Sequence, residues 1–221
     1  MDSRITVIGK QNSYLNQVLY ELRDENIQLD RLRFRNNLLK MGEILAYEIS
    51  KHFTYTPRQV RTQLGTLEMN LLSEQPVLVS ILRAGLSLHE GLLKFFDQAD
   101  NGFISAFRHH TNGNQFIVKV QYQAAPDISG RDLILIDPMI ATGKSAVLCH
   151  QALVESSGQP ERVFIAGVIA SDEGLEYVLR HIPKARIFVG AVDYELTAKA
   201  YIVPGLGDAG DLAFGPKDDH D

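Results

Sequence analysis

Four short runs of apolar and mostly β-branched residues constrain the fold of this chain more than any other feature of its sequence. They cover residues 76–82, 132–137, 162–169 and 185–192. Near-continuous apolar runs are typical of strands that are buried on both faces of a parallel sheet. Helical stretches are predicted between the runs, at residues 86–96, 144–156 and 173–181. This alternation predicts an α/β fold in which helices flank a parallel sheet.

Two further helices are predicted before the first run, at residues 13–25 and 30–52. In the first of them, apolar residues recur at helical spacing, at Leu15, Val18, Leu19 and Leu22. Asp30 is a candidate cap for the second helix. The charges of the second helix are interpreted as a solvated face, formed by Arg31, Arg33 and Arg35.

One segment, at about residues 103–123, breaks the alternation. Residues 103–107 and 116–122 are both predicted to be strands, and the Asn112-Gly113 pair between them is a strong signal for a hairpin turn. The segment therefore predicts an antiparallel β-arm that projects from the parallel sheet. Such an arm covers a site, joins subunits or is an edge hairpin without a further role, and the sequence leaves these alternatives open.

Length and composition allow one sizeable core, or a core with a small appendage, and we expect a single domain, residues 1–221. The chain is 45% hydrophobic, which is enough apolar material for one sizeable core. Its formal net charge of -5 makes nucleic acid a poor candidate partner. The single cysteine, Cys149, cannot form an internal disulfide and argues against a thiolate zinc site. Because the N-terminus does not lead into an apolar signal core and no apolar run approaches the about 20 residues that span a bilayer, we expect a cytoplasmic protein.

The loop at residues 137–145 is the strongest functional motif. It follows a predicted buried strand that ends in Asp137, it contains Thr142, Gly143 and Ser145, and it leads into a predicted helix. In open α/β sheets, ligands bind at the carboxyl ends of the strands. Glycine lets the backbone approach a phosphate closely, and the N-terminus of a helix attracts an anion. The loop is therefore predicted to bind a sugar phosphate, with Asp137 accepting hydrogen bonds from sugar hydroxyls.

Two classes of ligand compete for this loop. Thr142-Gly143-Lys144-Ser145 resembles the end of a Walker A loop, which would make the chain an ATP-dependent kinase. That pattern requires glycine where this chain has Pro138, and the loop follows two candidate strands instead of opening the domain. The alternative ligand is phosphoribosyl pyrophosphate (PRPP), because residues 137–145 also resemble the signature loop of phosphoribosyltransferases.

Two arginines and a glycine-rich segment supply the remaining candidate site residues. Arg83 and Arg108 each lie at a predicted strand end, where a guanidinium can bind pyrophosphate in a bidentate way. Residues 200–215 are rich in glycine and contain a proline, which predicts a fixed, irregular backbone. An exposed backbone of this kind offers both an N–H and a C=O, the complement of the amide edge of uracil.

These pieces resemble uracil phosphoribosyltransferases, and they occur in the same order. The resemblance covers most of the chain. It rests on the loop from Asp137 to Ser145, on the N-terminal Leu22-Arg23-Asp24, and on the stretch from Tyr201 to Asp211, which is highly specific to that family. It implies a phosphoribosyltransferase-type parallel sheet flanked by helices, with the β-arm and with a C-terminal base-binding hood at about residues 193–215.

The resemblance also implies an activity and a set of site residues. The activity is the transfer of the phosphoribosyl group of PRPP to uracil, which gives uridine monophosphate (UMP) and pyrophosphate in pyrimidine salvage. PRPP is expected to contact Arg83, Arg108, Asp137, Pro138, Met139, Ile140, Ala141, Thr142, Gly143, Lys144, Ser145 and Asp208. Uracil is expected to contact Tyr201, Ile202, Gly207, Asp208 and Ala209. Two of these residues, Asp208 and Arg108, are expected to be catalytic.

A cofactor and partners follow from the same resemblance. Mg²⁺ is expected to accompany PRPP, held by ligand oxygens and water, and the protein is expected to have no metal site of its own. A homodimer or larger homo-oligomer is expected. Part of the family is activated by GTP, which makes GTP a candidate activator. Neither a nucleic acid nor a membrane is expected as a partner.

The chain departs from the family pattern at several positions. Lys144 stands where a second glycine is usual, Ala200 replaces another glycine, and the lysine usual near residues 121–126 is missing. Lys144 either adds charge near the phosphate or disturbs the backbone of the loop. These departures motivate an alternative function, a regulatory protein that binds PRPP or uracil with weak or lost catalysis.

Overall fold

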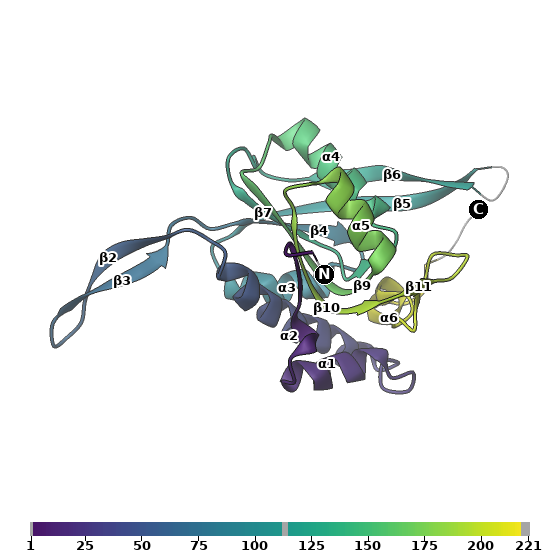
Figure 1. Ribbon diagram of the computed structural model, residues 1–221, viewed down its shortest axis with the longest axis horizontal. Coiled ribbons are helices and arrows are strands. Elements are labelled where there is room, and N and C mark those ends of the chain that lie inside the picture. Colours follow the sequence, from purple (N-terminus) through teal and green to yellow (C-terminus); the bar gives the residue numbers. More distant parts are fainter. Residues whose placement is uncertain (1, 112–114, 218–221) are drawn as a thin grey trace.

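The computed structural model describes residues 2–111 and 115–217, and a mostly parallel sheet forms its centre (Figure 1). For residues 106–111 and 115–119 only the backbone is described. The strands of this sheet, in spatial order, are β1 (Ile5–Val7), β10 (Arg186–Asp193), β9 (Arg162–Ser171), β7 (Asp132–Ile136), β4 (Val77–Leu82), β5 (Asp100–Thr111) and β6 (Gln115–Ala124). All neighbours on this path are parallel except β5 and β6.

Helices cover both faces of the sheet, as the alternation in the sequence predicts. The long helices are α1 (Tyr14–Arg23), α2 (Arg31–Ser50), α3 (Leu86–Phe95), α4 (Lys144–Ser157) and α5 (Asp172–His181). Alternate residues of the buried strands divide between two apolar cores. Leu78, Ile134 and Phe164 pack with α1, α2 and α3, whereas Val77, Leu135 and Ile165 pack with α4 and α5. The predicted α/β class is therefore confirmed.

The two N-terminal helices form where they are predicted. The Asp30 side chain accepts a hydrogen bond from the Arg33 backbone N–H (3.0 Å), so Asp30 caps α2. The interpretation of the α2 arginines as a solvated face is wrong for Arg35, because its guanidinium donates to the carbonyl oxygen of Ala213 (2.7 Å). This contact joins residues 178 positions apart, a separation that helical spacing alone does not reveal.

The β-arm also forms, and its inner half belongs to the main sheet. β5 pairs in parallel with β4 as far as the Leu82–Ser105 pair, and it pairs antiparallel with β6 along both parts of its length. The register shifts between Ser105 and Ala106, where the arm leaves the sheet. The predicted turn at residues 112–114 lies outside the described residues.

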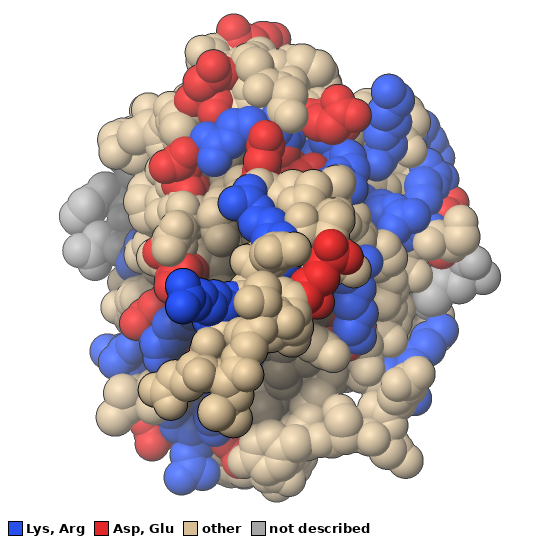
Figure 2. Space-filling model, turned by 90° about the vertical axis from the view of Figure 1, so that its left-hand side faces the viewer, with Lys and Arg blue, Asp and Glu red and all other residues tan. Residues whose placement is uncertain are grey.

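A second hairpin, formed by β2 (Tyr55–Arg61) and β3 (Thr66–Leu72), has no counterpart in the sequence prediction. It forms a separate antiparallel sheet that extends from the body of the molecule at the left of Figure 1. Nearly all of its residues are exposed, and only β3 shows an apolar alternation, at Leu67, Met69 and Leu71. Figure 2 views the molecule from this side, where much of the surface is neither acidic nor basic.

The C-terminal segment is more regular than expected. It contains the short strands β11 (Glu195–Leu196) and β12 (Ile202–Val203), and the six-residue helix α6 (Ala209–Phe214). The expectation of irregular backbone throughout residues 200–215 is therefore wrong at α6. The Asp208 side chain accepts from the Asp211 backbone N–H (3.0 Å) and so begins this helix as an N-cap.

Candidate active site

The predicted site residues gather at one edge of the sheet. Parallel strands end at a common edge, which is where α/β sheets bind ligands. Arg83 follows β4 and Asp137 follows β7, and these strands are neighbours with Ser80 opposite Ile136. The glycine-rich C-terminal segment follows β10 and returns to the same edge, because Gly210 lies beside Ala84.

The first half of the phosphate loop is attached to β9. Within it, the short strand β8 (Met139–Ile140) pairs in parallel with Ile169 and Ala170. The Asp137 N–H donates to the carbonyl oxygen of Ala166 (3.0 Å), and the Pro138 carbonyl accepts from Val168 and Ile169. These bonds bury Asp137, Pro138 and Ile140, whereas Met139, Ala141, Thr142 and Ser145 are half-buried. The part of the loop that reaches solvent is therefore its second half.

The second half of the loop is held by the start of α5. Gly143 has a φ of 71°, and a side chain on it would lie 2.6 Å from the carbonyl oxygen of Gly174. The Ser171 hydroxyl donates to the Ala141 carbonyl (2.5 Å) and accepts from the Gly174 N–H (2.9 Å). Ser171 therefore ties the loop to α5. No role was predicted for Ser171 from the sequence, although a serine just before a predicted helix is an N-cap signal.

Lys144 is exposed and is the first residue of α4. The helix begins directly after Gly143, and the Val147 N–H donates to the Gly143 carbonyl (3.1 Å). The lysine side chain therefore extends from the first turn of α4 and is exposed to solvent. Of the two expectations for Lys144, the geometry favours added charge beside the loop.

Asp137 carries the unusual electrostatics of the site. Burial raises the pKa of its carboxyl to about 6, and the Met139 N–H, which donates to Oδ1 (3.2 Å), acts in the opposite direction. Burial, with Asp137 as a lesser cause, raises the pKa of the nearby Cys149 thiol to about 12. An acid kept in this environment is suited to accept hydrogen bonds from a ligand, whereas the thiol is chemically inert.

Arg83 connects the sheet edge to the C-terminal segment. Its Nη2 donates to Asp211 Oδ1 (3.0 Å) and to the Gly215 carbonyl (3.1 Å). Its Nε is buried and has no hydrogen-bond partner within the described part of the chain. The guanidinium therefore joins the end of β4 to the C-terminal segment through Nη2.

The residues expected to contact a base lie in two short stretches of the C-terminal segment. Ile202 and Ala209 are buried, Asp208 is half-buried, and Tyr201 and Gly207 are exposed. The structure thus brings this segment to the same edge as Arg83 and the phosphate loop. Arg108 lies in β5 beyond the last pair with β4, on the arm, and its side chain is outside the described side chains.

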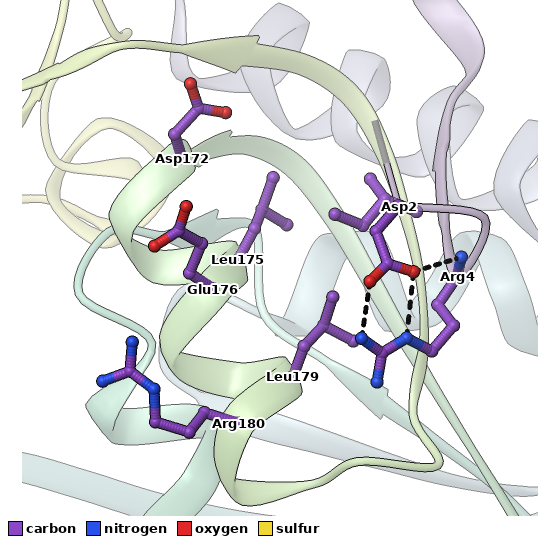
Figure 3. A pocket seen from close by; sticks show the side chains of 8 residues that line it. Asp2, Arg4, Asp172, Leu175, Glu176, Leu179 and Arg180 are labelled. Atoms are coloured by element: carbon purple, nitrogen blue, oxygen red, sulfur yellow. Dashed lines mark hydrogen bonds and ion pairs between the residues drawn. The ribbon is translucent and has the colours of Figure 1, made fainter.

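A separate hollow of about 480 Å³ lies between α5 and the N-terminal strand (Figure 3). Its charged groups include Asp2 and Arg4, which pair with each other, and Asp172 and Glu176 from α5. The phosphate loop contacts a different face of α5, through Gly174 and Val178. The hollow is therefore not part of the predicted site.

Two kinds of site or segment were not found among residues 2–111 and 115–217. No group of three or more histidine, cysteine or acidic side chains could hold a metal ion. No helix in this part of the chain is both long and apolar enough to cross a membrane.

The sheet, the loop after β7 and the segment that returns to the same edge define an α/β protein of the phosphoribosyltransferase class. The chain belongs to the uracil phosphoribosyltransferase family, because residues 9–216 match the model of that family. The resemblance seen in the sequence is thereby confirmed.

Individual relatives support the same assignment. The chain is 44% identical over 211 residues to a uracil phosphoribosyltransferase of Porphyromonas gingivalis, with 95% of this chain and 97% of that protein covered. It is 37% identical over 209 residues to one from Thermococcus gammatolerans, covering 93% of this chain and 91% of that protein. The solved AQ2163 protein from Aquifex aeolicus superimposes with a TM-score of 0.85 at 31% identity, covering 96% of this chain and 98% of that one.

Proposed function

We propose that this protein joins N1 of uracil to C1′ of PRPP and releases UMP and pyrophosphate, as a step of pyrimidine salvage. The observation that carries the proposal is the convergence of three elements at one sheet edge. These are the loop after β7, Arg83 after β4, and the C-terminal segment that bears the specific family motif.

PRPP is proposed to lie along the loop after β7. The backbone N–H groups at the start of α4, with the hydroxyls of Thr142 and Ser145, would bind the 5′-phosphate. Asp137 would accept hydrogen bonds from the ribose hydroxyls. Arg83 and Arg108 would bind the pyrophosphate, which suits the bidentate geometry of guanidinium groups. The remaining loop residues contribute mainly backbone, since Pro138 and Ile140 are buried.

Uracil is proposed to bind against the C-terminal segment. Backbone groups of Ile202 and of Gly207-Asp208-Ala209 would pair with the amide edge of the base, and Tyr201 would border its ring. Recognition by backbone requires the segment to keep one conformation. The glycines and the Asp208 cap support that requirement.

The reaction needs little acid–base chemistry from the protein. The bond between C1′ and pyrophosphate breaks, positive charge develops on the ribose ring, and N1 of uracil forms the new bond and loses its proton. Arg83 and Arg108 would stabilise the leaving group, and Asp208 would lie beside the reacting carbon. Orientation of the two substrates and stabilisation of charge would therefore supply most of the rate enhancement.

Mg²⁺ fits this donor set. It prefers oxygen ligands and usually keeps several waters with only one or two carboxylates, so PRPP and water would supply most of its ligands, and the half-buried Asp208 is a carboxylate that could add to them. When bound, the ion would neutralise charge on the pyrophosphate. Chelation by EDTA is expected to stop turnover, and added Mg²⁺ to restore it.

The proposal extends to assembly and location. A homodimer or larger homo-oligomer is supported by the exposed β2–β3 hairpin, since a two-stranded hairpin is marginally stable alone. A cytoplasmic location is supported by the buried, unpaired Cys149, which needs no oxidising compartment. GTP is a candidate activator, and a higher rate of UMP formation when GTP is added to the activity assay would support this role.

The experiment is a chromatographic assay of UMP from uracil, PRPP and Mg²⁺, with wild type beside Asp208→Asn. Asparagine also caps helices, so this variant removes the charge while α6 keeps its start. UMP from the wild type and a strong loss in the variant are expected. PRPP binding without UMP, especially if Lys144→Gly restored turnover, would favour the regulatory alternative. ATP-dependent phosphate transfer would favour the kinase.

A further inference from the structure

We propose that Arg23 and Asp193 are positioning residues for uracil, and that they act by fixing the backbone of the base-recognition segment. The inference rests on the proposed function, because it concerns the same segment. It assigns a role to a pair that binds Gly205, a residue outside both sets expected to contact PRPP and uracil.

The pair forms a closed set of hydrogen bonds around Gly205. Arg23 Nη1 donates to Asp193 Oδ2 (2.8 Å), and Nη2 donates to Oδ1 (2.9 Å). Arg23 Nη1 also donates to the Gly205 carbonyl (2.9 Å), and Asp193 Oδ2 accepts from the Gly205 N–H (3.0 Å). Both backbone groups of Gly205 are therefore bound by one bidentate ion pair.

Gly205 lies between the two stretches expected to recognise uracil. It follows Ile202 by three positions and precedes Asp208 by three. Its φ is 62°, and a side chain there would lie 2.0 Å from the Ile202 carbonyl oxygen. The chain turns sharply at this residue, so a change in its orientation would move Ile202 and Asp208 relative to each other.

Because it is largely buried, this ion pair holds the backbone of Gly205 more firmly than an exposed pair would. The Asp193 side chain is 9% exposed and that of Arg23 is 24% exposed. Charge-assisted bidentate bonds are short and directional, and partial burial reduces their screening by salt. The Gln28 amide adds support when its nitrogen faces the Leu206 carbonyl (2.8 Å) and the Leu22 carbonyl (3.1 Å).

The PRPP side of the site is supported by different contacts. The phosphate loop is tied to β9 and, through Ser171, to α5. Arg83 is held by Asp211 and the Gly215 carbonyl. Loosening the Arg23–Asp193 pair should therefore weaken the binding of uracil more than that of PRPP, for which Asp208 is one expected contact among many.

The test compares Arg23→Lys and Asp193→Asn with a matched pair elsewhere in the fold. Arg162 makes a bidentate contact with Asp132 (2.6 Å for both bonds) and also donates to the His52 carbonyl (2.7 Å). That pair lies where β7 and β9 begin, at the edge opposite the site. Arg162→Lys and Asp132→Asn thus remove the same kind of contact away from the substrates.

In the Arg23 and Asp193 variants, KM for uracil is expected to rise by about tenfold and KM for PRPP by less than about threefold, while kcat falls because Asp208 moves with the segment. The control variants should lower Tm to a similar extent as the Arg23 and Asp193 variants do, and they should leave both KM values unchanged. An unchanged KM for uracil, a parallel rise in both KM values, or the same shift in the controls would overturn the inference.

The outcome for wild type separates this inference from the proposed function. Wild type that forms no UMP would contradict the function, and calorimetric titration of uracil in the presence of PRPP would then test the pair directly. Weaker uracil binding only in the Arg23 and Asp193 variants supports the inference. Equal affinity in all the proteins contradicts it.

Discussion

At the scale of single residues, the buried carboxylate of Asp137 is expected to bind the ribose of PRPP and to lower the stability of the folded protein. Burial raises the pKa of its carboxyl to about 6, so the ionised form destabilises the folded protein at neutral pH. Asp137→Asn removes this charge and retains an oxygen for the Met139 N–H. At pH 8 we expect the variant to have a free energy of unfolding higher by about 1–3 kcal/mol, and to lose most of its activity.

The pH dependence tests the cause. Below the raised pKa, the folded wild type keeps the proton on Asp137 while the unfolded chain still releases it down to about pH 4. Wild-type stability therefore rises as pH falls from about 6 to about 4, and its difference from the variant narrows. Urea denaturation at pH 8 and pH 4.5 measures this difference. A difference that is independent of pH would show that burial of the charge is not the cause.

Ala200 is a residue held in an unfavourable backbone conformation. Its φ is 60°, in the left-handed region that favours glycine. The left-handed conformation costs a residue that carries a Cβ about 1–2 kcal/mol, and a glycine avoids this cost. Glycine also increases the conformational entropy of the unfolded chain, which offsets part of the resulting stabilisation. Ala200→Gly should therefore stabilise the protein by about 0.5–1 kcal/mol in chemical denaturation.

Ala198 provides the control for this substitution. It lies in the same turn, and its φ is not positive. Ala198→Gly should be neutral or destabilising, because it relieves no strain and only increases the freedom of the unfolded chain. Equal stabilisation by both glycines would contradict the explanation from left-handed strain.

The residues of the site divide into those that a sequence reveals and those that it does not. The loop from Asp137 to Ser145 could be predicted because its chemistry is contiguous and follows a strand. The Arg23–Asp193 pair could not, since its members are 170 positions apart and meet only after the sheet and α1 have packed. Contiguous motifs are readable from one sequence, whereas supporting contacts depend on tertiary structure.

At the scale of elements, burial decides what could be predicted. Strands β4, β7, β9 and β10 were predicted from their apolar runs, because both of their faces are covered. The β2–β3 hairpin was missed although Leu67, Met69 and Leu71 alternate with polar residues in β3, because β2 shows no such alternation and both strands are exposed. Helix α6 was missed because the glycines around it predict irregular backbone. Its N-cap, Asp208, was interpreted as a ligand contact and not as the start of a helix.

The hairpin carries a prediction about assembly. Leu67, Met69 and Leu71 alternate along β3, so they share one face, and Leu67 and Met69 are each 45% exposed. If this row packs against a second copy, Leu67→Glu combined with Met69→Glu should reduce the molecular mass in light scattering from that of an oligomer to that of a monomer. Glu68→Lys, on the opposite face, is the control. An unchanged mass in the double variant would contradict this role.

At the scale of the whole molecule, the two apolar cores share one sheet. Each buried strand contributes alternate residues to both cores, so neither core can be lost without the other. The chain should therefore unfold as the single domain that its composition predicts.

The thiol of Cys149 reports this transition. It is fully buried, and burial raises its pKa to about 12, so a thiol reagent should not label the native protein. Labelling should begin at the same urea concentration at which helical circular dichroism is lost. Labelling well before the loss of helix would indicate that the α4–α5 side opens separately and would contradict single-domain unfolding.

The central claim is that the carboxyl edge of the sheet joins uracil to the ribose of PRPP. Phosphorus NMR of the protein with PRPP, Mg²⁺ and uracil tests it most directly. We expect the PRPP signals to be replaced by those of the 5′-phosphate of UMP and of free pyrophosphate in equal amounts, and only when uracil is present. Unchanged PRPP, or pyrophosphate released without UMP, would contradict it.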